Sequence, residues 1–142
     1  MARVRFNYAD VKSINLKDKN KVKQFVESIF VQEGKSLKEL NYIFCSDSYL
    51  LEINQSHLHH DYYTDIITFD LSEDASVTGE IYISVDRVKD NSSTIGTPFS
   101  EELLRVIFHG ALHLVGYKDK KKSEITIMRD KEDYYLRLFG SK

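Results

Sequence analysis

The sequence is poor in residues that crosslink a chain, interrupt its helices and strands, or anchor it in a membrane. Its single cysteine, Cys45, has no partner for an internal disulfide, so an oxidising compartment is not implied. Pro98 is the only proline, and no glycine- or proline-rich linker divides the 142 residues. No apolar run approaches the roughly 20 residues of a membrane span, and the first residues lack the apolar stretch of a signal peptide. We therefore expect a single domain, residues 1–142, without a membrane segment, in the cytoplasm.

A strong excess of one charge is also missing. Lys and Arg total 20 against 22 for Asp and Glu, which gives a net charge of -2. A dedicated nucleic-acid-binding protein usually carries a broad basic face, so any contact with RNA or DNA has to come from a local patch. The hydrophobic content of 42% is ordinary for a globular protein and argues against disorder.

Hydrophobic periodicity predicts an α+β fold. Alternating apolar residues predict strands at 3–8, 40–45, 66–71 and 80–85. Apolar residues spaced three and four apart predict helices at 16–33, after 46 or 47, after 86, at 100–115 and at 123–139. Gly34 is placed to end the first helix, and Asp86 and Ser100 are placed to cap the third and fourth. Four short strands mixed with about five helices indicate a sheet with helices packed on it.

The fourth helix carries the strongest functional motif. His109 and His113 lie four residues apart, which places both imidazoles on one face of a helix. Gly116 can end the helix, and Asp119 follows ten residues after His109, giving the pattern H-x-x-x-H-x-x-G-x-x-D. This spacing matches the ligands of the metzincin motif, H-E-x-x-H-x-x-G-x-x-H, with aspartate in the third place. Three protein ligands leave a fourth position for water, as in catalytic zinc sites.

Two histidines on an apolar helix are also compatible with ordinary core residues. The glycine and the carboxylate at the third-ligand spacing favour a metal. The general base of a zincin would be glutamate at the position of Gly110, which has no side chain. The ordinary metalloprotease mechanism therefore lacks its proton acceptor.

Three segments resemble the YbeY family, bacterial metal-dependent endoribonucleases. Residues 109–117, HGALHLVGY, are similar to the family signature H-G-x-L-H-L-x-G-Y. Asn54 followed by TDIITF at 64–69 resembles its L-N-…-T-D-V-L-S-F block, and GEIYIS at 79–84 resembles its G-D-I-x-I-S strand. The three segments occur in the family's order and extend the resemblance over nearly the whole chain.

The resemblance implies an α+β sandwich around a mixed four-stranded sheet, with His109 and His113 as zinc ligands. It implies single-strand-specific RNA cleavage, in 3′ maturation of small-subunit (16S) rRNA and in ribosome quality control. A metal-activated water would attack the phosphodiester. The implied partners are single-stranded RNA and the ribosome; the general acid, the general base and the oligomeric state stay unidentified.

Two positions depart from the family pattern. The third ligand of the family is usually histidine, whereas Asp119 stands here, and its carboxylate can broaden metal choice beyond zinc. The family usually carries an arginine where Leu58 stands, so a phosphate needs another cation. We expect Lys118, Lys120 and Lys121 beside the site to be candidates, although a lysine run is often plain solvated surface.

A second polar cluster precedes the third strand. His57, His59 and His60, with Asp61 and Asp65, could bind a second metal. The histidines lie in a predicted loop, 57–63, and consecutive loop histidines rarely converge on one ion, so surface exposure is the simpler interpretation. Asp65 either holds a loop through backbone hydrogen bonds or orients a ligand histidine, and we favour the structural role. Cys45 falls inside an apolar strand, which predicts an inert core thiol.

Two other functions stay open at this point. The metzincin spacing is compatible with a metal-dependent peptidase or amide hydrolase, although the missing glutamate counts against it. A ribosome-associated protein with a structural metal would show a site closed by four protein ligands.

Overall fold

The structure, a computed structural model, describes residues 3–59 and 63–140. These ranges contain β1 (Val4–Tyr8), α1 (Lys19–Gln32), β2 (Leu37–Cys45), α2 (Asp47–Leu58), β3 (Ile66–Asp70), β4 (Val77–Ser84), α3 (Val85–Ile95), α4 (Phe99–Leu114) and α5 (Lys122–Gly140). The predicted α+β class, with four strands and five helices in these ranges, is confirmed. None of the described helices is both long enough and apolar enough to span a membrane.

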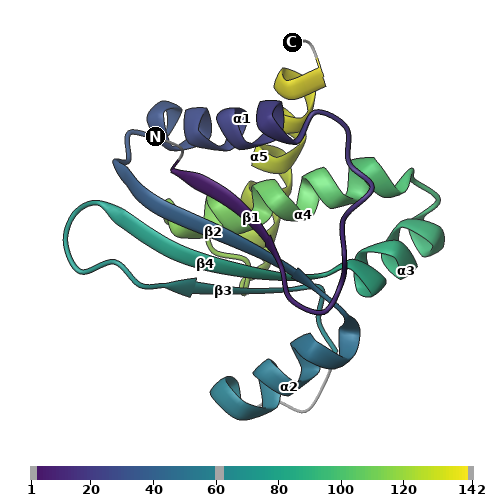
Figure 1. Cartoon of the computed structure of the whole chain (residues 1–142). Coiled ribbons are helices and arrows are strands. Elements are labelled where there is room, and N and C mark those ends of the chain that lie inside the picture. Colours follow the sequence, from purple (N-terminus) through teal and green to yellow (C-terminus); the bar gives the residue numbers. More distant parts are fainter. Residues whose placement is uncertain (1–2, 60–62, 141–142) are drawn as a thin grey trace.

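The strands form one mixed sheet in the order β1-β2-β4-β3 (Figure 1). β1 pairs parallel with β2, and β2 parallel with β4. β3 pairs antiparallel with β4 and forms one edge of the sheet. The first crossover is made by α1, because parallel neighbours cannot be joined by a tight turn.

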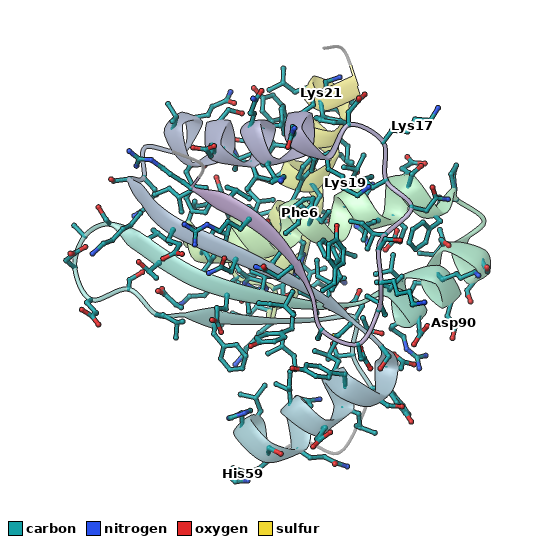
Figure 2. All side chains as sticks on the ribbon, in the orientation of Figure 1. Phe6, Lys17, Lys19, Lys21, His59 and Asp90 are labelled. Atoms are coloured by element: carbon teal, nitrogen blue, oxygen red, sulfur yellow. The ribbon has the colours of Figure 1, made fainter. Side chains whose placement is uncertain are left out.

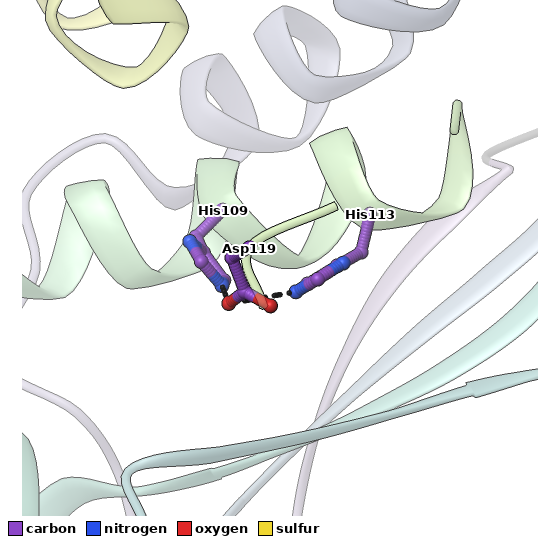
Figure 3. A group of neighbouring side chains, drawn as sticks. All are labelled: His109, His113 and Asp119. Carbon is purple, nitrogen blue, oxygen red and sulfur yellow. Dashed lines mark ion pairs between the residues drawn. The ribbon is translucent and has the colours of Figure 1, made fainter. Parts of the chain in front are cut away.

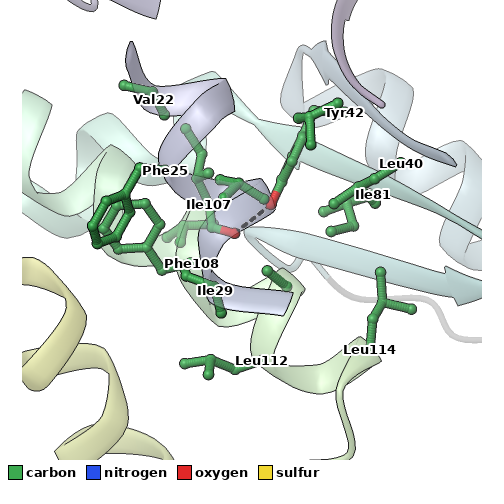
Figure 4. Close-up of a cluster of buried hydrophobic side chains, with 14 of the residues drawn as sticks. Val22, Phe25, Ile29, Leu40, Tyr42, Ile81, Ile107, Phe108, Leu112 and Leu114 are labelled. Carbon is green, nitrogen blue, oxygen red and sulfur yellow. Dashed lines mark hydrogen bonds between the residues drawn. The ribbon is translucent and has the colours of Figure 1, made fainter. Parts of the chain in front are cut away.

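The two faces of the sheet carry separate cores. Helices α1, α4 and α5 lie on one face, and α2 lies beyond the other (Figure 1). The main core contains Phe25, Tyr42, Ile81 and Ile107, which are buried between these helices and the sheet (Figure 4). A smaller core beside α2 contains Cys45, whose burial raises the pKa of the thiol to about 12. Cys45 is thus a buried core thiol, as predicted.

Several predicted helix boundaries are wrong. The first helix begins at Lys19 and not at 16, because Asp18 has a left-handed backbone conformation (φ 53°) that no α-helix contains. The cap of α3 is Ser84, whose hydroxyl accepts a hydrogen bond from the backbone N–H of Arg87, so Asp86 lies in the first turn instead. Pro98 precedes α4, which places Ser100 inside the helix. Gly34, with φ 73°, follows α1 as predicted.

Gly110 allows α4 to lie close to the sheet. A Cβ atom at this position would lie 2.7 Å from Cδ1 of Ile81 and 3.1 Å from Cδ1 of Ile66. The face of α4 that carries Gly110 therefore packs on β3 and β4. His109 and His113 lie on a neighbouring face and are only half-buried.

Candidate metal centre

Three side chains converge at the end of α4. Nε2 of His109 and Nε2 of His113 each lie 3.2 Å from Oδ2 of Asp119 (Figure 3). The two imidazole rings are nearly perpendicular, with centroids 4.7 Å apart. The predicted residues are therefore brought together, and we call them the His-His-Asp group.

The spacing of these atoms suits a metal ion. One ligand atom from each residue lies within 4.8 Å of the others. Metal–ligand bonds of about 2.0–2.1 Å in a tetrahedral zinc site separate neighbouring ligand atoms by roughly 3.3–3.4 Å. The two 3.2 Å separations from Asp119 are close to that value. The donor set, two imidazoles and a carboxylate, fits zinc and also other transition metals.

A glycine turn brings Asp119 back to the helix. Gly116 has φ 116°, a conformation that residues with a Cβ rarely adopt. The backbone N–H of Tyr117 then donates to the carbonyl of Leu112 over 3.0 Å, which closes the helix end. The chain reverses after this bond, and this reversal places the carboxylate of Asp119 against both histidines.

A buried glutamate supports His109 from behind. Oε2 of Glu132, on α5, lies 2.6 Å from Nδ1 of His109. Arg105 donates to Oε1 of Glu132 over 2.9 Å and to Asp133 over 2.7 Å. Burial works to raise the pKa of Glu132, but hydrogen bonds from His109 and Arg105 hold it below its usual value. Burial likewise works to lower the pKa of His109, and the hydrogen bond and charge of Glu132 raise it overall.

Sequence reasoning missed this support. Glu132 occupies a core position of α5, because Met128 and Tyr135 on the same face are buried too. A glutamate at such a position of an amphipathic helix was the available signal, since buried carboxylates are nearly always paired. Its partner depends on how α5 lies on α4, which the sequence does not give.

The His-His-Asp group opens into a cleft of about 740 Å³. One wall comes from α4 and α5, and the other from the end of α2 and the edge strand β3. The cleft is lined by Asn54, Leu58, Thr64, Asp65, Ile66, Ile67, Thr68, Asp70, Glu102, Arg105, Val106, His109, His113, Leu114, Asp119, Lys120, Arg129 and Glu132. Among the lining residues that the structure describes, five are aspartate or glutamate and three are lysine or arginine, so this lining is not predominantly positive.

The three lysines predicted to bind phosphate differ in their position relative to the cleft. Lys120 lines the cleft, whereas Lys118 and Lys121 are exposed outside its lining. Arg129, which the sequence did not single out, also lines it, and 58% of its side chain is exposed. Leu58 faces the same cleft, where it carries no charge.

Asp65 lines the cleft and immediately precedes β3. Its backbone carbonyl accepts from the N–H of Ser84, and Asn91 donates to its carboxylate over 3.5 Å. Burial raises the pKa of Asp65, and the positive charge of His109 partly offsets this. These contacts join β3 to β4 and α3, which is compatible with the structural role that we favour.

His57 and His59, the other histidines that the structure describes, are not members of the His-His-Asp group. His57 and Leu58 belong to α2, so the predicted loop begins later than expected. His59 ends the helix at an exposed position (Figure 2). The exposure expected of His57 and His59 is confirmed, while His60 and Asp61 lie outside the described residues.

Fold and site together define an α+β protein in which a helix and the turn after it present a His-His-Asp group suited to a metal. Residues 6–140 match the family model described as endoribonuclease YbeY. The chain belongs to this family.

Curated relatives match over almost the full length. The Endoribonuclease YbeY of Flavobacterium psychrophilum is 46% identical and is covered, like this chain, to 98%. That of Cytophaga hutchinsonii is 48% identical over 94% of both chains. The solution structure of TM1509 from Thermotoga maritima aligns with a TM-score of 0.68 and 29% identity, covering 96% of this chain and 88% of that one.

Proposed function

We propose that this protein is a metal-dependent endoribonuclease that cleaves single-stranded RNA at the His-His-Asp group. The observation that carries the proposal is the convergence of His109, His113 and Asp119 at the wall of an open cleft. The relatives that match over nearly the whole chain are named Endoribonuclease YbeY, which supports an RNA substrate.

His109, His113 and Asp119 are the proposed ligands. A divalent ion held there would supply a water of lowered pKa and would neutralise charge on a phosphoryl oxygen. The two imidazoles are neutral ligands, and Asp119 brings one negative charge to the ion. Zinc is the proposed metal, and the carboxylate keeps manganese and other divalent ions as alternatives.

The charges of the cleft determine how RNA is held. Arg105 is occupied by Glu132 and Asp133, so Lys120 and Arg129 are the lining cations that can meet a phosphate. They lie in the part of the cleft that holds Asp119 and Glu132. Because acidic residues outnumber basic ones, we infer that RNA binds through a few phosphates near the metal.

Two alternatives receive less support. A zincin peptidase needs a glutamate at position 110, where the Cβ alone would overlap Ile81. A closed structural metal site needs a fourth ligand residue, and the described residues supply three, which face the cleft. The further proposals of 16S rRNA maturation and ribosome association rest on family resemblance, whereas the proposal of a cytoplasmic location rests on the composition of the sequence.

The decisive experiment compares RNA cleavage by the purified protein and two histidine variants. His113→Ala removes a proposed ligand, whereas His57→Ala removes an exposed histidine of α2 outside the cleft lining. We expect a single-stranded oligonucleotide to be cut by the wild-type protein and by His57→Ala. A chelator should abolish cleavage, and added zinc or manganese should restore it.

The same assay can reject the proposal. Equal cleavage by the wild-type protein and His113→Ala would mean that the activity does not belong to this site. A casein or peptide substrate that is turned over in a chelator-sensitive way, without RNA cleavage, would instead favour the peptidase. Activity on double-stranded RNA at the same rate would remove the single-strand preference.

A further inference from the structure

We propose that Glu132 is a positioning residue for the metal centre, which fixes the proton of His109 on Nδ1 and thereby directs the Nε2 lone pair towards the ion. Arg105 holds Glu132 in place for this task. The inference rests on the proposed metal site, and it adds to that site a support from α5.

Contacts on both oxygens fix the orientation of the glutamate. Oε2 meets Nδ1 of His109 at 2.6 Å, and Oε1 accepts from Arg105 at 2.9 Å. Arg129 contributes a weaker contact at 3.5 Å. The side chain of Glu132 is only 6% exposed, so water competes little for these bonds. With both oxygens engaged, the carboxylate has little freedom to rotate.

The orientation matters because a neutral imidazole carries one proton. An acceptor at Nδ1 favours the tautomer with Nδ1–H, which leaves the lone pair on Nε2. Nε2 is the atom that lies 3.2 Å from Asp119, so the free lone pair is on the side of the ligand group. A carboxylate behind a ligand histidine also makes the imidazole a stronger ligand.

The two ligand histidines differ in this respect. Among the residues that the structure describes, no carboxylate other than that of Asp119 contacts His113. Its ring packs at a right angle against His109 instead. The inference therefore predicts one histidine with a fixed tautomer and one without, which gives an internal comparison within a single protein.

The first test needs no variant. In the zinc-loaded wild-type protein, long-range ¹H–¹⁵N spectra of the imidazoles should show His109 bound through Nε2, with a hydrogen-bonded Nδ1–H that exchanges slowly. His113 should show no such protected proton. A His109 that binds zinc through Nδ1, or whose Nδ1–H exchanges as freely as that of His113, would overturn the inference.

The second test measures zinc affinity by competition with a chromophoric chelator. Glu132→Gln keeps the size of the side chain and a neutral acceptor, whereas Glu132→Ala removes both. We expect affinity to fall by about 10–100-fold, more for Ala than for Gln. Asp130→Asn, an exposed position on the same helix, is the matched control and should bind like wild type.

The outcomes separate this inference from the proposed function. Folded Glu132 variants with wild-type zinc affinity would refute the positioning role and leave the nuclease untouched. A wild-type protein that binds zinc but cleaves no RNA would refute the nuclease alone. A wild-type protein that binds no divalent metal would refute both.

Discussion

The hydroxyl of Tyr42, on β2, donates a 2.7 Å hydrogen bond to the backbone carbonyl of Ile107, in α4 (Figure 4). Tyr42 is fully buried, and Ile107 precedes the proposed ligand His109 by two residues. The bond therefore ties α4 to β2, an interior strand of the sheet.

Removing this hydroxyl should destabilise the fold without creating a cavity in the core. Tyr42→Phe keeps the ring, so we expect a loss of about 1 kcal/mol in the free energy of unfolding and a melting temperature lower by about 2–5 °C. Thermal unfolding followed by circular dichroism measures the change. Tyr49→Phe, at a position 36% exposed, should melt like wild type. Equal melting of all three proteins would contradict a stabilising role for the bond.

The close approach of α4 to the sheet can be tested at Gly110. In Gly110→Ala the new Cβ would lie 2.7 Å from Ile81, and we expect destabilisation by about 1–3 kcal/mol despite the better helix propensity of alanine. Gly140→Ala, at the end of α5, meets no atom within 4 Å and should be nearly neutral. Ile81→Val removes the nearest methyl and should partly rescue Gly110→Ala in urea unfolding. A stabilised Gly110→Ala protein would show that the sheet residues around Gly110 can shift to make room for the new Cβ at little energetic cost.

Cations inside and outside the cleft should differ in their effect on RNA. Lys120→Gln and Arg129→Gln should each raise KM several-fold and reduce the salt dependence of binding, because each removes one phosphate contact. Lys118→Gln and Lys121→Gln remove the same charge from outside the cleft lining and should change KM little. Similar effects from all four variants, measured at two salt concentrations, would point to a diffuse attraction instead.

The third ligand should control metal choice. Asp119→His replaces the carboxylate of the proposed third ligand by an imidazole, and imidazole suits zinc better than manganese. We expect the ratio of zinc to manganese affinity to rise in this variant, as measured by competitive titration of each metal. An unchanged ratio would show that the position does not set selectivity.

A cluster around Glu33, separate from the His-His-Asp group, should make the free energy of unfolding depend on pH. Glu33 accepts hydrogen bonds from Tyr117, at 2.7 Å, and from Tyr135, and it pairs with Lys131 at 3.2 Å. Burial works to raise its pKa, but these three partners lower the pKa below its ordinary value of 4.5. The ionised form is thus favoured by folding, and its contribution is present above pH 4.5 and lost as the pH falls through the lowered pKa.

Urea unfolding at pH 7 and at lower pH measures this contribution. Glu33→Gln should be less stable than wild type at pH 7, and the difference should shrink below about pH 4.5. Glu39→Gln, which removes an exposed partner of Arg5, is the control for a general charge effect. A constant difference between wild type and Glu33→Gln across this range would reject the linkage.

Local pattern was sufficient to predict that His109, His113 and Asp119 come together, but it was insufficient to predict the residues around them. The spacing of His109 and His113 is a property of one helix. Gly116 indicates the turn that brings Asp119 back towards both histidines. Glu132 and Arg129 reach the site because α5 packs on α4. The spacing of apolar residues within one helix does not predict that packing. The lysines that follow Asp119 are neighbours in sequence, yet the turn directs only Lys120 to the cleft.

For the fold, too, local pattern predicted the elements but not their arrangement. Alternation of apolar residues located all four strands within a few residues, whereas their order in the sheet came only from the structure. Helix starts were misplaced where backbone conformation or a neighbouring hydroxyl decided them. Asp18, with its left-handed φ, and Ser84, at the end of a strand, are two such positions.

The two walls of the cleft differ in how far apart their residues lie along the chain. His109 and its support Glu132 are separated by 23 positions, so the ligand wall is assembled from one helical hairpin, α4 and α5. The opposite wall requires β3, which is placed by pairing with β4 at the edge of the sheet. Contacts close in sequence cost less loop entropy to form. The convergence of the proposed metal ligands is thus supported by contacts close in sequence, whereas the shape of the cleft depends on the pairing of β3 with β4.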